Sequence, residues 1–164
     1  MKHLFSLIAL ILLSLPLAAQ TYEKNDVYAV FTYRFTKMTE HPSSGDYKIV
    51  IFGNSDVAKR MANFHNSVSN GRKILIIDTN KVEDTKDAHM VFIGDARTSK
   101  LSEVLALAPN ALIITERNNQ FAKGSHISFL TVDNKVGFEL SKTNSEAKGI
   151  KLSKEILTYA KRVE

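Results

Sequence analysis

The sequence predicts a single α/β domain in which a mostly parallel β-sheet carries helices on both faces. Short, continuously apolar runs occur four times, separated by polar connections and by stretches with helical spacing. Continuous apolar runs are typical of strands that are covered on both faces, as in parallel sheets. Their alternation with helices indicates βα units with right-handed crossovers. The predicted strands are residues 49–52, 74–77, 90–93 and 112–114.

The C-terminal third predicts a closing β-hairpin and a helix. An alternating apolar run over 127–129 precedes Asp133-Asn134, and a second one over 136–140 follows it. Two alternating runs around a two-residue turn are a hairpin signal. After Gly149 the apolar residues return at helical spacing, which predicts an amphipathic helix. Its apolar face would contain Leu152, Ile156, Leu157, Ala160 and Val163. The fold class is therefore a single Rossmann-like α/β domain with a closing hairpin and a C-terminal helix.

Three further helices are expected from apolar spacing. The first, capped by Asn25 or Asp26, would bury Val27, Val30, Phe31, Phe35 and Met38, with Tyr28 and Tyr33 beside that face. It would end before Pro42, because a residue that precedes proline avoids the α region. The second would contain Val57, Met61, Phe64 and Val68, and the third Leu101, Val104, Leu105 and Ala108. Exposed aromatic residues on the first helix would form a self-complementary patch, so a homodimer is a further expectation.

Residues 1–19 have the pattern of an export signal. Lys2 and His3 precede an apolar run over 4–17, and Ala18-Ala19 follows it. The run is shorter than the roughly 20 residues that span a membrane, so we expect cleavage after Ala19 rather than stable membrane insertion. No cysteine follows the run, which excludes a lipid-anchored lipoprotein. The expected organisation is a signal peptide over 1–19 and one α/β domain over 20–164.

Charge and cysteine content exclude several classes of function. Removal of residues 1–19 takes away one basic residue and no acidic one, which leaves 21 basic against 17 acidic side chains. These charges are spread along the chain, so nucleic-acid binding is not indicated. The sequence contains no cysteine. Disulfides, thiolate metal sites and thiol catalysis within this chain are therefore excluded.

Ligands of open α/β sheets bind at the carboxyl ends of the parallel strands, and the predicted strands carry polar groups there. Gly53-Asn54-Ser55 could hold an anion at a helix N-terminus, but neither G-x-G-x-x-G nor a P-loop lysine is present. Asp78, Asp95 and Glu116 could cluster, although caps and turns explain them equally well. A receiver-type phospho-acceptor site would need paired acids where the chain has Asn54-Ser55.

No catalytic pattern emerges from the remaining side chains. The histidines beyond the signal region, namely His41, His65, His89 and His126, do not pair at helical spacing, so no zinc-binding helix is present. His89 is expected as a core histidine, and His126 is expected to point to solvent. G-x-S-x-G is absent, and Ser145-x-x-Lys148 stands alone in a polar stretch. We expect no enzyme activity, cofactor or metal.

Several blocks of the sequence follow one another in a recognisable order. They are residues 28–37 with Glu40-His41-Pro42, then 49–53, Gly71-Arg72, 88–93, 123–129, 135–140 and 149–157, and together they span nearly the whole chain after residue 19. In these blocks the sequence resembles the YfiR-like family of exported bacterial proteins. Two positions depart from the family pattern. His41 replaces the usual tryptophan of Glu-Trp-Pro, and Ala88 replaces the usual cysteine before His89, so redox control by cysteines cannot operate here.

The resemblance implies a periplasmic, non-enzymatic regulator that binds the sensor domain of a membrane protein. In one branch of the family that partner is a diguanylate cyclase, whose cyclic-di-GMP synthesis is repressed, and a histidine kinase is a second expectation. The expected contact residues are His41, Pro42, Glu116, Arg117 and Phe121, all placed in loops. The alternatives are a small-ligand-binding protein that uses the strand-end cleft near Asn54 and Arg117, and an unrecognised hydrolase.

Overall fold

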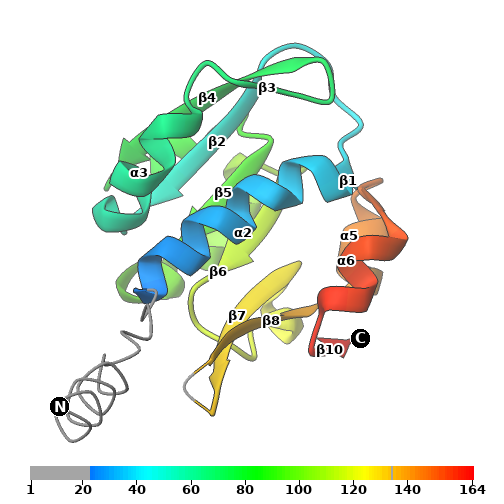
Figure 1. Cartoon of the computed structure of the whole chain (residues 1–164). Coiled ribbons are helices and arrows are strands. Elements are labelled where there is room, and N and C mark those ends of the chain that lie inside the picture. Colours follow the sequence, from blue (N-terminus) through cyan, green and yellow to red (C-terminus); the bar gives the residue numbers. More distant parts are fainter. Residues whose placement is uncertain (1–22, 134) are drawn as a thin grey trace, which may run out of the picture.

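The computed structural model describes residues 23–133 and 135–164, which form one large sheet with helices on both faces (Figure 1). The sheet has the strand order β10-β8-β7-β6-β5-β2-β4-β3. Its strands are β2 (Tyr47–Phe52), β3 (Val68–Ser69), β4 (Arg72–Thr79), β5 (Met90–Ile93), β6 (Leu112–Thr115), β7 (Ile127–Val132), β8 (Lys135–Leu140) and β10 (Arg162–Val163). The predicted α/β fold with a mostly parallel sheet is confirmed. The predicted signal peptide and its cleavage site lie outside the described residues.

The helical elements connect these strands. They are α2 (Lys24–Met38), α3 (Ser55–Met61), α4 (Leu101–Leu107), α5 (Lys142–Ala147) and α6 (Lys154–Tyr159), with 3₁₀ turns η2 (Ala62–Phe64), η3 (Val82–Thr85), η4 (Asp95–Lys100) and η5 (Phe121–Lys123). A separate two-stranded sheet pairs β1 (Thr39–Glu40) with β9 (Lys151–Leu152). Over residues 23–133 and 135–164, no helix combines the length and apolarity that crossing a membrane requires.

The central strands are parallel and covered on both sides. β4, β2, β5, β6 and β7 pair in parallel register. Successive side chains of a strand point to opposite faces. Ile49 and Ile51 of β2 therefore join the core beneath α2 and α3, whereas Val50 and Phe52 join the core beneath η3 and α4. All residues of β5 and β6 are buried, which explains why these runs are continuously apolar in the sequence.

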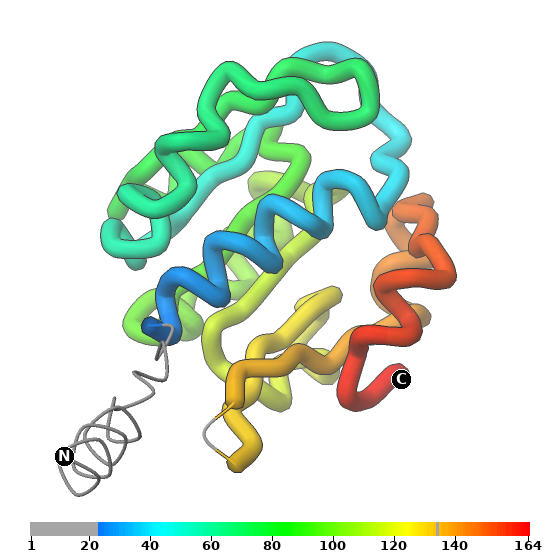
Figure 2. Tube along the Cα trace, viewed as in Figure 1, coloured from blue at the N-terminus to red at the C-terminus, as the bar shows by residue number. Residues whose placement is uncertain are grey.

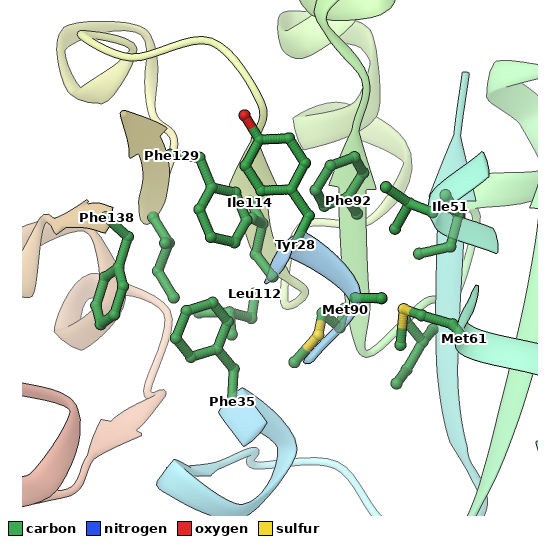
Figure 3. Packing of buried hydrophobic residues seen from close by; sticks show 14 of the residues in the cluster. Tyr28, Phe35, Ile51, Met61, Met90, Phe92, Leu112, Ile114, Phe129 and Phe138 are labelled. Atoms are coloured by element: carbon green, nitrogen blue, oxygen red, sulfur yellow. The ribbon is translucent and has the colours of Figure 1, made fainter. Parts of the chain in front are cut away.

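Helix α2 crosses one face of the sheet between α3 and α6 (Figures 1 and 2). Its aromatic side chains pack on the hairpin formed by β7 and β8. The ring centroids of Tyr28 and Phe129 are 4.4 Å apart, and those of Phe35 and Phe138 are 5.0 Å apart. Figure 3 shows these four rings gathered over the central strands. Burying a side chain of this size contributes about 1.5–3 kcal/mol, so this cluster fixes α2 on the sheet.

The buried face of α2 differs from the predicted one. Tyr28 is 1% exposed and lies in the core, whereas Val30 is 44% exposed. The buried face also includes Thr32 and Thr36, and an apolar pattern cannot assign polar threonines to a core. The aromatic rings of α2 pack within the domain rather than forming the predicted exposed patch. Tyr33, for example, stacks on Phe64 at 4.0 Å.

The predicted cap of α2 is also wrong. The helix begins at Lys24, and no side chain among the described residues caps it. Asp26 instead accepts a hydrogen bond from Arg60 of α3, and Glu23 pairs with the same guanidinium. These two acidic side chains therefore connect α2 to α3 and do not cap the backbone N–H groups of the first turn of α2.

The second predicted helix ends earlier than its apolar spacing suggests. Val68 belongs to β3, is 64% exposed and pairs antiparallel with β4. The turn between these strands is Asn70-Gly71, with φ values of 49° and 74°. Positive φ at both central residues is what a type I′ hairpin turn requires, and Asn-Gly meets that need. The Asn-Gly pair therefore forms the turn of a short hairpin.

The predicted C-terminal helix is divided among several elements. Helix α5, capped by the hydroxyl of Ser141, precedes Gly149 and was missed. Leu152 lies in β9, and Val163 lies in β10, where it pairs with β8. Only the short helix α6 remains, and its Ile156 is fully buried. The β7–β8 hairpin is confirmed by six register pairs, although its turn is described only at Asp133.

His126 is buried, contrary to the prediction that it points to solvent. The side chain is 1% exposed, and its Nδ1 accepts a hydrogen bond of 2.7 Å from the backbone N–H of Ile113. Burial, together with the charge of Lys148, lowers the pKa of His126 to about 4. The neutral imidazole is therefore part of the folded state, and its protonation opposes folding.

This linkage predicts a loss of stability in acid. The pKa of His126 is about 4 when folded, against an ordinary value of 6.5. Its contribution is fully present above pH 6.5 and is lost as the pH falls toward 4. His126→Asn keeps a hydrogen-bond acceptor but does not titrate. In urea titrations between pH 6 and 4.5, we expect this variant to reduce the pH slope of the unfolding free energy by about 1 kcal/mol per pH unit.

His65→Asn is the matched control for that measurement. The Nδ1 of His65 also accepts a backbone N–H, that of Ile76 at 3.0 Å, but its side chain is exposed. The control should leave the slope unchanged. Equal slopes for His126→Asn and the unmodified protein would contradict the assignment.

Candidate functional site

The carboxyl ends of the parallel strands are the usual ligand site of open α/β sheets. Strand order reverses between β2 and β5, so a ligand would be expected beside Gly53 and Gly94. The two strand ends are in close contact at this point. A Cβ atom on Gly94 would lie 2.5 Å from the carbonyl oxygen of Gly53. The backbones therefore leave little room for a ligand between them.

Glu116 occupies the position next to this contact. Its side chain is 12% exposed. The carboxylate accepts hydrogen bonds from Lys24 Nζ at 3.2 Å, Asn54 Nδ2 at 3.0 Å and the backbone N–H of Asp95 at 3.1 Å. These three donors are the groups that could hold an external anion. The protein satisfies them with its own carboxylate.

The other acidic side chains of this edge have separate partners. Arg117 Nε donates to Asp95 Oδ1 at 2.7 Å, and this guanidinium lowers the pKa of the Asp95 carboxyl. Asp78 accepts a hydrogen bond from the hydroxyl of Ser55. In the part of the chain that the structure describes, no group of three or more histidine or acidic side chains could hold a metal ion.

A second candidate site lies at the opposite, amino-terminal edge of the same strands. His41 follows β1, and its Nε2 lies within hydrogen-bond distance of the Asn110 carbonyl, just before β6. A carbonyl only accepts, so Nε2 carries the proton and Nδ1 is an acceptor. Consistent with this, Nδ1 lies 2.7 Å from the hydroxyl of Ser43 and 3.2 Å from its backbone nitrogen. These bonds fix the segment 41–46, which we call the His41 loop.

Two further rings pack against His41. Its centroid lies 5.0 Å from that of His89 and 6.2 Å from that of Tyr47. Burial lowers the pKa of His41, and burial together with the charge of Arg72 lowers the pKa of His89 to about 4. Both imidazoles are therefore neutral near pH 7. This cluster joins the amino ends of β2 and β5 to the His41 loop.

Two recesses open on either side of His41, and His41 and Ser43 line both of them. The first has a volume of about 280 Å³, and the second about 270 Å³. The remaining lining residues of the first are Thr36, Thr39, Glu40, Tyr47, Asn70 and Arg72. Those of the second are Asp87, Ala88, His89, Ala108, Pro109 and Asn110. Two recesses therefore flank His41 at the amino-terminal edge.

The five predicted contact residues do not form one surface. His41 and Pro42 lie together at the amino-terminal edge, whereas Glu116 and Arg117 follow β6 at the carboxyl edge. Phe121 is not in an exposed loop, because it lies in η5 and is only 6% exposed. Its ring packs beneath the guanidinium of Arg162. The set is thus divided between two opposite edges and the core.

Sequence reasoning overlooked Tyr47 and Asn110 at the amino-terminal edge, because each stands at or beside the start of a strand, where no motif marks it. Arg72 was noted only as part of the family resemblance and was given no role in a site. Their convergence depends on strand order, because β4 and β6 lie on opposite sides of the β2–β5 pair. The nearest signal in the sequence was the Asn-Gly turn, which places Arg72 at the beginning of β4.

The network around Glu116 predicts a structural role for this carboxylate. Glu116→Gln keeps the shape of the side chain but removes the charge that three donors share. Hydrogen bonds to charged groups contribute about 1.5–3 kcal/mol each, and relaxation will recover part of this. We expect a loss of about 2 kcal/mol in the free energy of unfolding, measured by urea titration at pH 7.

Glu103→Gln is the control, since it removes an exposed pair with Lys100. Exposed pairs contribute about 0–1 kcal/mol, so this variant should change little. Equal effects of the two substitutions would contradict the role assigned to Glu116.

Comparisons with known proteins agree with the fold. A solved structure, a conserved domain protein from Vibrio cholerae O1 biovar El Tor, superposes with a TM-score of 0.58 at 12% sequence identity. The superposition covers 86% of this chain and 60% of that one, so the chain spans less than two thirds of that protein. At this identity the likeness shows the fold alone. No curated protein matches the chain.

The sequence pattern of one protein family matches residues 25–161. The match includes α2, all strands up to β9 and both sheet edges described above, and it leaves out only the ends of the described chain. It therefore covers far more than half of the sequence. The chain belongs to the YfiR/HmsC-like family.

Proposed function

We propose that this protein is a non-enzymatic periplasmic regulator that binds the sensor domain of a membrane signalling protein, either a diguanylate cyclase or a histidine kinase. The observation that carries the proposal is the family match over residues 25–161, because YfiR-like proteins are periplasmic regulatory proteins rather than enzymes. Regulation requires only that the protein bind one conformer of its partner more tightly than the other.

The amino-terminal edge is the better candidate for the contact surface. The His41 loop is held by side-chain bonds to Asn110 and Ser43, and Pro42 within it is exposed. A loop that is already ordered loses little entropy on binding. Both departures from the family pattern, His41 and Ala88, line the recess of about 270 Å³ beside this loop. A surface that varies within a family in this way fits a partner that differs between members.

The alternative function, small-ligand binding at the carboxyl ends of the strands, has less support from the geometry. Asn54 donates to Glu116, and Arg117 pairs with Asp95. A ligand at this edge would have to displace one of these internal carboxylates. The hydrolase alternative would need titratable side chains that converge in a cleft. The two histidines at the amino-terminal edge do converge, but His41 is engaged through both ring nitrogens.

A binding experiment tests the contact surface. Tagged protein would be captured from cross-linked envelopes of its own host, and the membrane partner identified by its periplasmic sensor domain and cytoplasmic cyclase or kinase domain. We expect the double variant His41→Ala, Pro42→Ala to weaken binding to the isolated sensor domain at least tenfold, because a few residues usually dominate such interfaces.

Arg117→Ala at the opposite edge is the control and should bind normally. Loss of binding in Arg117→Ala with none in the double variant would place the contact at the carboxyl edge instead. Recovery of no membrane signalling protein at all would refute the proposed function.

A further inference from the structure

The recess of about 280 Å³ on the β4 side of the His41 loop is lined by two notable polar groups. Among the described residues, one is a guanidinium without a counter-ion, and the other is a buried hydroxyl without a hydrogen-bond partner. We call this cavity the Tyr47–Arg72 recess, after two residues that line it. Its wall is formed by the end of α2, by β1, by the start of β2 and by the β3–β4 turn. It is therefore a built cavity rather than a gap beside one flexible loop.

Arg72 provides a positive charge without a negative partner. Nε donates to the carbonyl of Gly45 at 2.6 Å, and Nη2 approaches the carbonyls of Ser44 and Asp46 at 3.3 Å. The guanidinium carbon lies 4.9 Å from the ring centroid of Tyr47. Among the described residues, none forms an ion pair with Arg72. The guanidinium is thus fixed in place, and its charge has no internal counter-ion.

Tyr47 provides a second unmet group. Its side chain is 3% exposed, and the hydroxyl has no hydrogen-bond partner among the described residues. The hydroxyl of Thr39 lies near enough to affect the pKa of Tyr47, but it donates to the carbonyl of Phe35 at 2.7 Å and forms no hydrogen bond of ordinary geometry with the phenol. Burial raises the pKa of Tyr47 to about 12, so the phenol stays protonated and remains a donor. A buried donor without an acceptor costs about 1–3 kcal/mol, which a bound acceptor would offset.

The rest of the wall limits the charge of a ligand. Glu40 also lines the recess, and its carboxylate pairs with Lys151 at 3.3 Å. An acidic side chain at the rim disfavours a doubly charged anion such as phosphate. A single carboxylate group matches one guanidinium, which can bind it through two parallel N–H groups. The volume is just below the range of about 300–1,000 Å³ typical of sites for drug-sized ligands, so the ligand should be small.

We propose that the Tyr47–Arg72 recess binds a small organic monocarboxylate, with its carboxylate on the Arg72 guanidinium and in reach of the Tyr47 hydroxyl. The ligand supplies the counter-ion and the acceptor that the protein lacks at this position. This assignment does not rest on the proposed regulatory function, because it concerns direct binding to the isolated protein.

Nuclear magnetic resonance of the ¹⁵N-labelled protein tests the proposal. Propionate is the probe, at constant ionic strength and pH 7, with propionamide as its neutral isostere and inorganic phosphate as the higher charge. We expect propionate to cause a saturable shift of the Arg72 side-chain N–H resonance and of the Tyr47 backbone resonance. Propionamide and phosphate should bind at least tenfold more weakly.

Three variants locate the binding. Arg72→Gln should weaken propionate binding at least tenfold, and Tyr47→Phe by about threefold or more, in line with losing a charged and a neutral hydrogen-bond donor. Arg34→Gln removes an exposed arginine elsewhere on the surface and should bind normally. Arg72 also holds the His41 loop, so Arg72→Gln could fail to fold. In that case Tyr47→Phe, which loses only a hydroxyl, decides whether the site binds propionate.

Several results would overturn the proposal. Shifts that do not saturate, or that are the same in Arg34→Gln and Tyr47→Phe, would show general attraction to a basic protein. Equal affinity for propionamide would show that charge is not recognised. Equal or tighter binding of phosphate would remove the monocarboxylate assignment.

Discussion

The packing of α2 on the closing hairpin is the contact on which the rest of the structure depends. Tyr28 and Phe35 meet Phe129 and Phe138 across more than 90 residues of chain. This contact holds the first helix over the β5–β6–β7 region (Figure 3). It also brings the end of α2 to the C-terminal segment, so that β1 can pair with β9. The His41 loop begins immediately after that pair.

The two edges of the sheet have different properties as a consequence. At the carboxyl edge, Lys24 at the start of α2 reaches Glu116, and the donors of that edge are satisfied internally. At the amino-terminal edge, α2 ends and leaves the ring cluster around His41 open on two sides. A Rossmann-like sheet usually binds ligands at its carboxyl edge. In this protein the recesses around His41 lie at the other edge.

The sequence was sufficient for the elements that are apolar on both faces, because continuous runs such as 90–93 admit few other interpretations. It was insufficient where tertiary pairing decided the outcome. Val68 and Leu152 have helical spacing but lie in short strands. The Asn70-Gly71 turn lets the strand of Val68 pair with β4, and β1, which follows α2, pairs with the strand of Leu152. Tyr47 and Arg72 are 25 residues apart in the sequence and meet only because β2 and β4 are neighbours. Burial of His126 could not be read from a position at the start of a strand.

We propose that the amino-terminal edge, and not the carboxyl edge, binds a membrane signalling partner. Site-specific photo-cross-linking in the host tests it most directly, with the cross-linker placed at Pro42 or, on the opposite edge, at Arg117. We predict that the Pro42 position cross-links to the sensor domain of one membrane protein and that the Arg117 position does not. A cross-link from Arg117 alone would contradict the account.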